Sequence, residues 1–212
     1  MAHPHDHEHE HDPEHDHEHD GEPDHDHESE HHAEEARAEA EADARRRLAL
    51  TQIRQYPDSA LRLVANEVTE FDDDLGRLVE RMIVLMHDAQ GVGLAATQVG
   101  VLRRLFVFEP DDDGPRAVVN PTIVERGGEN EIDEEGCLSL QGVRLPVERA
   151  TSLTLAGKDE HGADVEFELD VYAARIVQHE LDHLDGLLII DRTDEEHRKL
   201  ALATLRPRVV LR

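Results

Sequence analysis

The clearest pattern of hydrophobic and polar positions lies between Phe71 and Ala89. The apolar residues there recur every three or four positions, at Leu75, Leu78, Val79, Met82, Ile83 and Met86. This spacing places them along one stripe of a helix. Gly91 and Gly93 follow soon after. The pattern therefore predicts an amphipathic helix that ends before these two glycines.

Extended segments follow this helix. Apolar runs and one alternating segment predict strands at residues 102–109, 117–124, 145–155 and 163–170. We also expect a turn at Gly127–Asn130, a helix at Val171–Leu184, a short strand at Leu187–Ile190 and a last helix from about Asp194. Because strands and helices do not alternate as βαβ units, the prediction is an α+β fold. Antiparallel or mixed sheets would pack around a central helix.

Charge divides the chain into unequal parts. Its 212 residues include 50 Asp and Glu against 22 Lys and Arg, a formal net charge of −28. Residues 1–32 hold thirteen of these acids, twelve of the 17 histidines and no Lys or Arg. With almost nothing apolar to bury, this tail is predicted to be disordered. Residues 33–50, rich in Ala, Glu and Arg, predict a helical connector, and residues 51–212 form the compact domain.

The tail has two interpretations. Its histidines alternate with aspartates and glutamates, and His-rich tracts commonly bind divalent metal ions. The tail would then bind metal in addition to any ion in the compact domain. The alternative is a solubilising or purification segment without a chemical role.

Composition excludes several classes of protein. An acidic chain is not expected to read nucleic acid, which needs cations to neutralise phosphates. No apolar run approaches the ~20 residues that span a bilayer, and the N-terminus lacks the order of a secretory signal. The single cysteine, Cys137, excludes an internal disulfide and fits a reducing compartment. We expect a soluble, cytoplasmic protein with no membrane partner.

The segment His179-Glu180-Leu181-Asp182-His183 matches the metal-binding pattern H-E-x-x-H. On a helix both imidazoles share a face and can bind one metal ion. Glu180 projects about 100° further round, close enough to act on a bound water without being a ligand. The same pattern recurs at residues 7–11 and 27–31, where no apolar face would hold a helix. Only the copy at 179–183 is predicted to form a site.

A catalytic metal site commonly has three protein ligands. Cys137, within Glu135-Gly136-Cys137-Leu138-Ser139, is the most suggestive third ligand, because a thiolate with two imidazoles suits Zn²⁺ or Fe²⁺. The alternative for a lone cysteine is a small buried hydrophobe. The glycines of Gly91–Gln98 let a backbone pass close to a ligand. The Gln98 amide suits oxyanion stabilisation, or an ordinary hydrogen bond.

Together these three segments resemble the peptide deformylase family. Its motifs G-x-G-x-A-A-x-Q, E-G-C-x-S and Q-H-E-x-D-H-x-x-G are matched in order by Gly91–Gln98, Glu135–Ser139 and Gln178–Gly186. The similarity runs from about Tyr56 to Asp191. The resemblance implies that Cys137, His179 and His183 bind one divalent metal ion per chain. That ion is usually ferrous iron in this family, with zinc, nickel or cobalt as substitutes.

The resemblance also implies roles for other residues. Glu180 would be the general base and acid, and the Gln98 amide and Leu138 backbone N–H would form an oxyanion hole. Gly93 and Arg144 would contact the substrate. The reaction would remove the formyl group from N-formylmethionyl nascent peptides and release formate. In this family a C-terminal segment can dock on the ribosome, and the alternative for the basic C-terminal segment here is a solvated helix face with a loose end.

Two residues depart from the family's pattern, and two other functions compete with it. Gln141 and Glu148 stand where proline is common, in a segment expected to border the peptide cleft, so they bear on substrate preference. A zinc peptidase with the same helix motif would take its third ligand downstream, from Asp185, Asp191 or His197, and would not need Cys137. A metal-storage protein would instead depend on its tail.

Overall fold

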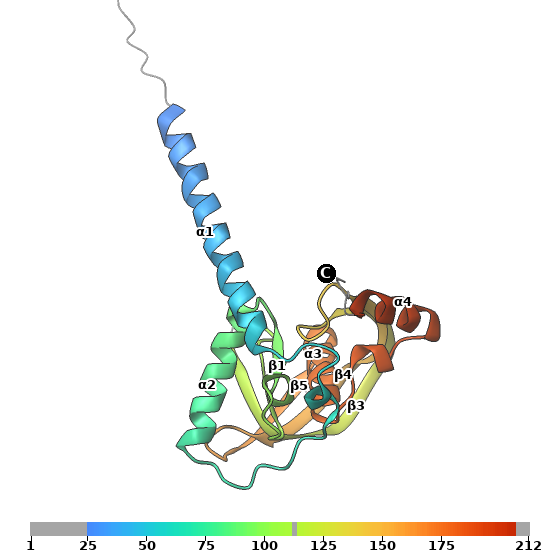
Figure 1. Cartoon of the computed structure of the whole chain (residues 1–212). Coiled ribbons are helices and arrows are strands. Elements are labelled where there is room, and N and C mark those ends of the chain that lie inside the picture. The colour runs from blue at the N-terminus through green and yellow to red at the C-terminus, as the bar shows by residue number, and fades with distance from the viewer. Residues whose placement is uncertain (1–24, 112–113, 207–212) are drawn as a thin grey trace, which may run out of the picture. The chain divides into compact units, whose positions relative to one another are not determined.

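The computed structural model describes residues 25–111 and 114–206, without the side chains of residues 25–30 and 33 (Figure 1). Contacts divide the chain into two units, Met1–Glu39 and Ala40–Arg212. Helix α1 runs from His25 to Gln52. Residues 25–32, predicted as disordered tail, are thus helical, because no proline or glycine interrupts the chain between Pro23 and Pro57. Residues 1–24 lie outside the described residues, so for them the prediction of disorder stays a prediction.

The strands form one antiparallel sheet in chain order (Figure 1). They are β1 (Gly93–Ala95), β2 (Leu105–Phe108), β3 (Arg116–Gly136), β4 (Arg144–Lys158) and β5 (Asp164–Leu169). Each strand pairs with its neighbour in sequence. The α+β class is confirmed, but in the described residues a single antiparallel sheet replaces the expected antiparallel or mixed sheets.

The long hairpin of β3 and β4 contains a second difference from the predicted elements. The turn predicted at Gly127–Asn130 is wrong, because these residues lie inside β3. Its glycines produce a bulge instead, with Gly128 at a φ of +71° and a shift in pairing register between Gly127 and Asn130. The single strand β3 therefore covers the strand predicted at 117–124, the predicted turn and residues 131–136, for which no strand was predicted.

The helices of the second unit follow the predicted pattern closely. Besides the end of α1 they are α2 (Asp73–Asp88), α3 (Val171–Leu184) and α4 (Glu195–Leu205), with short 3₁₀ helices at Ser59–Arg62, Ala96–Val99 and Ile189–Asp191. The last of these replaces the strand predicted at Leu187–Ile190, which is wrong. The Asp191 carboxylate accepts the Leu188 backbone N–H at 2.9 Å and closes a turn there.

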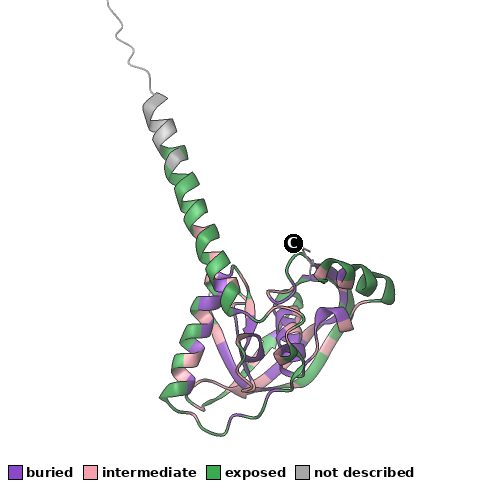
Figure 2. Cartoon of the chain, in the orientation of Figure 1, coloured by how far each residue is buried: buried purple, intermediate pink, exposed green. Residues whose placement is uncertain are grey.

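Strand β2 is buried on both faces and joins two cores. Leu105 and Val107 pack with α2, whereas Phe106 and Phe108 pack with α3. Figure 2 shows α3 buried along most of its length and α4 mostly exposed. Among the helices of residues 25–206, none combines the length and the apolar character that crossing a bilayer requires. The buried helix α3 carries residues 179–183, the predicted metal motif.

Candidate active site

Helix α3 presents its two histidines on one face, as the spacing predicts. The Nε2 atoms of His179 and His183 lie 3.2 Å apart, and the ring centroids are 4.9 Å apart. His183 is buried, with 1% of its surface exposed. Four residues make slightly more than one helical turn, so both rings point to one locus.

Cys137 directly follows the end of β3 and completes the predicted ligand set. Its Sγ atom lies 3.3 Å from Nε2 of His183. The donor atoms of Cys137, His179 and His183 all lie within 4.8 Å of one another, and no other described residues form such a group of His, Cys, Asp or Glu. The motif copy at 7–11 lies outside the described residues, and most side chains of the copy at 27–31 do as well. The structure thus brings together the three predicted ligands.

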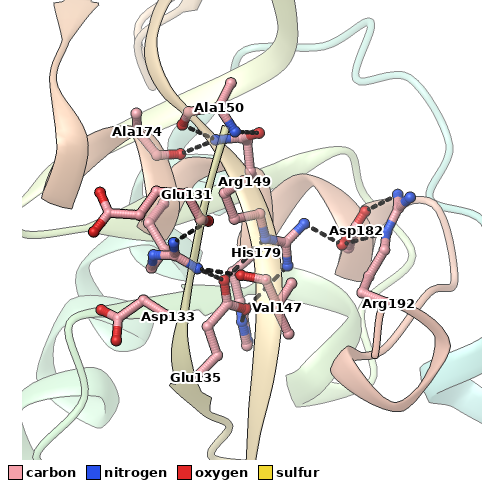
Figure 3. Close-up of polar contacts among 12 residues, drawn as sticks. Glu131, Asp133, Glu135, Val147, Arg149, Ala150, Ala174, His179, Asp182 and Arg192 are labelled. Carbon is pink, nitrogen blue, oxygen red and sulfur yellow. Dashed lines mark hydrogen bonds and ion pairs between the residues drawn. The ribbon is translucent and has the colours of Figure 1, made fainter. Parts of the chain in front are cut away.

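A buried network of carboxylates and arginines bonds to His179 through Nδ1, the ring nitrogen that does not face the other ligands (Figure 3). Glu135 accepts two hydrogen bonds from Arg149, at 2.9 and 3.0 Å, and one from Arg175 at 2.9 Å. His179 Nδ1–H donates to the same carboxylate at 3.0 Å. Arg149 also donates to Asp182 at 2.7 Å, so the network connects β4 to α3 a second time.

This network fixes the chemistry of His179. A proton held on Nδ1 by Glu135 leaves the Nε2 lone pair free for a metal ion. Burial would raise the pKa of Glu135, but hydrogen bonds from His179 and Arg149 outweigh it and lower the pKa to about 2. Glu135 therefore stays ionised. Sequence reasoning assigned no role to Glu135, Arg149 or Arg175; the only signal was that Glu135 opens one of the three motifs.

The segment Gly91–Gln98 forms β1 and the 3₁₀ helix after it. The Gln98 Oε1 atom accepts the Ala95 backbone N–H at 2.8 Å, which leaves its Nε2 as the outward donor. That Nε2 lies 3.1 Å from Ser139 Oγ and 3.9 Å from Cys137 Sγ. The Leu138 backbone N–H has no hydrogen-bond partner among the described residues. Two N–H donors thus lie beside the ligand set.

Glu180 lies between the ligand set and β1. It is 3% exposed, and its Oε2 atom has no hydrogen-bond partner among the described residues. Burial raises the pKa of Glu180 from 4.5 to about 7. A Cβ atom on Gly93 would collide with the Glu180 carboxylate, since it would lie 2.9 Å from Cδ. Glycine at position 93 therefore makes room for this carboxylate.

These groups line a cleft of about 670 Å³, within the range typical of ligand sites. Gly93 and Arg144, for which substrate contact is predicted, both border it, and so does Gln141. Glu148 does not, because it lines a separate cavity that includes Arg104 and Arg192. The expectation that Glu148 borders the peptide cleft is therefore wrong.

The third ligand of a zinc peptidase is not found near the histidines. Asp185 pairs with Arg104 at 2.7 Å, and Asp191 pairs with Arg62. His197 contacts Asp194 at 2.6 Å on the exposed α4. Each downstream candidate thus has another partner, whereas Cys137 lies beside the two histidines.

A Cys/His/His donor set with a buried carboxylate and two N–H donors defines a metallohydrolase site. Comparison with known proteins agrees. The polypeptide deformylase family model matches residues 50–199. A peptide deformylase of Thermotoga sp. (strain RQ2) is 47% identical over 149 residues, which cover 70% of this chain and 90% of that protein.

Solved structures give the same result. The peptide deformylase of Thermotoga maritima is 47% identical with a TM-score of 0.65, over 67% of this chain and 96% of that one. The enzyme of Synechococcus elongatus, in complex with actinonin, is 36% identical with a TM-score of 0.69, over 72% and 85%. The chain therefore belongs to the polypeptide deformylase family. Its activity is the removal of the N-formyl group from nascent polypeptides.

Proposed function

We propose that the chain releases formate from N-formylmethionyl nascent peptides at a centre held by Cys137, His179 and His183, with Glu180 as general base and acid. The observation that carries this proposal is the convergence of three donor atoms beside a buried carboxylate that has an unpartnered oxygen. We place the reaction in the cytoplasm, where nascent chains emerge.

The donor geometry supports the ligand assignment. Tetrahedral coordination at usual bond lengths separates a thiolate sulfur from an imidazole nitrogen by about 3.6 Å, and two nitrogens by about 3.3 Å. The corresponding distances here are 3.3 Å between Cys137 and His183 and 3.2 Å between the two histidines. Both separations therefore suit binding to one ion, and all three donor atoms lie within 4.8 Å of one another. One thiolate and two imidazoles suit Fe²⁺ or Zn²⁺, and we propose ferrous iron because the family usually carries it.

When bound, the ion would supply Lewis acidity that lowers the pKa of water and polarises the formyl carbonyl. The chain's own residues would move the proton and stabilise charge. Glu180 would accept the proton of the attacking water and return it to the leaving amine nitrogen. The Gln98 Nε2 and the Leu138 backbone N–H would donate to the formyl oxygen as it becomes negative.

The test is formate release from an N-formylmethionyl peptide by anaerobically prepared, iron-loaded protein. We expect Glu180→Gln to keep its metal and lose about 10²–10⁴-fold in kcat. Glu196→Gln, on the exposed start of α4, is the matched control and should behave as wild type. Cys137→Ser should lose both metal and activity. Formate release that survives Cys137→Ser at full rate would contradict the ligand assignment and favour the zinc peptidase.

The tail carries a further proposal, separate from the catalytic centre. We propose that the histidines of residues 1–32 bind additional divalent metal, on the basis of composition alone. Deleting these residues should then lower the metal bound per chain but not the turnover of loaded enzyme, whereas equal binding would refute it. Ribosome docking by the C-terminal segment stays a prediction. In α4, Arg198 and Lys199 pair with Asp191 and Glu195.

A further inference from the structure

One cation in the cleft comes from outside the segment shared with the family. The family match begins at residue 50, whereas Arg46 lies on α1 before that point. Arg46 is half-buried and lines the same cleft as Gly93 and His179. Helix α1 therefore adds a side chain to the cleft that the shared segment does not contain.

The position of Arg46 is fixed by the packing of α1. Ala49 is buried and Leu50 is partly buried in the core that α2 and β2 share. Because residues three and four apart share a helix face, Arg46 lies on the face that packs inward. Its neighbours Arg45 and Arg47 are exposed and do not line the cleft.

The segment directly after α1, which ends at Gln52, is attached to the catalytic segments. The Arg54 backbone N–H donates to the Gln98 carbonyl at 2.7 Å. The Gln55 Nε2 donates to the Leu138 carbonyl at 3.0 Å. The chain that follows α1 is thus bonded to the two residues that carry the proposed oxyanion donors.

Arg46 differs from the other cations of the cleft in its lack of a counter-ion. Arg144 pairs with Glu134 at 3.5 Å, and Arg175 pairs with Glu135 at 2.9 Å. Arg46 makes no ion pair or hydrogen bond with any residue that the structure describes. In a chain with a net charge of −28, an unneutralised guanidinium in the substrate cleft is available for an anion on the substrate.

We propose that Arg46 selects formyl peptides that carry a side-chain carboxylate on one of the residues after the formylmethionine. This inference rests on the proposed function, which places the formyl group at the metal end of the cleft. A partly exposed ion pair of this kind changes affinity by about 1.4- to 5-fold at low ionic strength, and salt screens it. Such an interaction, away from the reacting atoms, acts on KM.

The test uses four C-terminally amidated peptides, so that the only carboxylate is a side chain. They are formyl-Met-Ala-Ala-Ala and its versions with Asp at the second, third or fourth position. The full-length, iron-loaded chain is compared with Arg46→Ala, Arg46→Glu and the matched controls Arg45→Ala and Arg47→Ala. Initial rates of formate release at low and high salt give kcat and KM for each combination of enzyme variant and peptide.

We expect wild type to prefer at least one Asp peptide over the Ala peptide by about two- to fivefold in kcat/KM at low salt, through KM. Arg46→Ala should remove that preference for the Asp peptide, Arg46→Glu should reverse it, and both control variants should keep it. A ratio that is independent of Arg46, or that falls equally in the controls, would overturn this inference alone. If no peptide releases formate from wild type, the proposed function fails as well.

Discussion

Replacing Gly93 by alanine tests the position of Glu180 with one carbon atom. Gly93 lies in β1 without a positive φ, so alanine can adopt its backbone conformation. The added Cβ would lie 2.9 Å from the Glu180 Cδ, whereas ordinary contact begins at 3.4 Å. The carboxyl carbon must therefore retreat by about 0.5 Å, and its nearer oxygen by more. Since misplacing a reacting group by about 1 Å can cost ~10²-fold, kcat should fall about 10- to 100-fold.

The matched control is Gly76→Ala in α2, where a Cβ meets nothing within 4 Å. It should leave kcat unchanged and raise the melting temperature by about 2–4 °C, because alanine is favoured over glycine in helices by about 1 kcal/mol. The assay is saturating formate release at equal metal content, with thermal melting beside it. A Gly93→Ala variant whose kcat stays within about twofold of wild type would refute the role given to the Glu180 carboxylate.

Three further outcomes are expected. Gln98→Ala should lower kcat about 10²–10³-fold at equal metal content, through loss of an oxyanion donor; an unchanged rate would remove it from the oxyanion hole. Glu135→Gln should weaken metal affinity about 10–100-fold in chelator competition, because His179 loses the carboxylate that orients it, and unaltered affinity would contradict this. The Arg62 hydrogen bond, against the opposing effect of burial, lowers the pKa of Asp191. That pair should stabilise the fold above about pH 3.8 and lose its effect as pH falls through the lowered pKa. Arg62→Ala should therefore lower the free energy of unfolding, measured in denaturant melts, by about 0.2–1 kcal/mol at pH 7 and by less in acid. A loss of stability that grows in acid would contradict this pH dependence.

The sequence predicted the parts of the site that depend on local spacing. Helix α3 has the predicted bounds, because its apolar residues and its histidines repeat with the helical period. Cys137 was suggested by chemistry and motif, since a thiolate beside two imidazoles completes a known type of ligand set. These features need no knowledge of which strands pair.

Features that depend on strand pairing could not be predicted. Local turn chemistry at Gly127–Asn130 gave no sign that β4 pairs along both sides of the bulge. The contact between Glu135 and Arg149 joins adjacent strands and depends on the register of β3 on β4. The contact of Arg149 with Asp182 depends on the packing of α3 against β4. The same register takes Glu148 away from the cleft, although its sequence neighbours suggested otherwise.

The single cysteine makes the centre vulnerable in a particular way. Cys137 is half-buried at the cleft, and the chain contains no second thiol. If its sulfur is oxidised to a sulfenic acid, no neighbouring cysteine can resolve it as an internal disulfide. Recovery must then come from an external thiol that reaches the cleft, in competition with irreversible oxidation to the sulfinic acid. The lifetime of the centre is therefore tied to the thiol pool around the protein rather than to the stability of its fold.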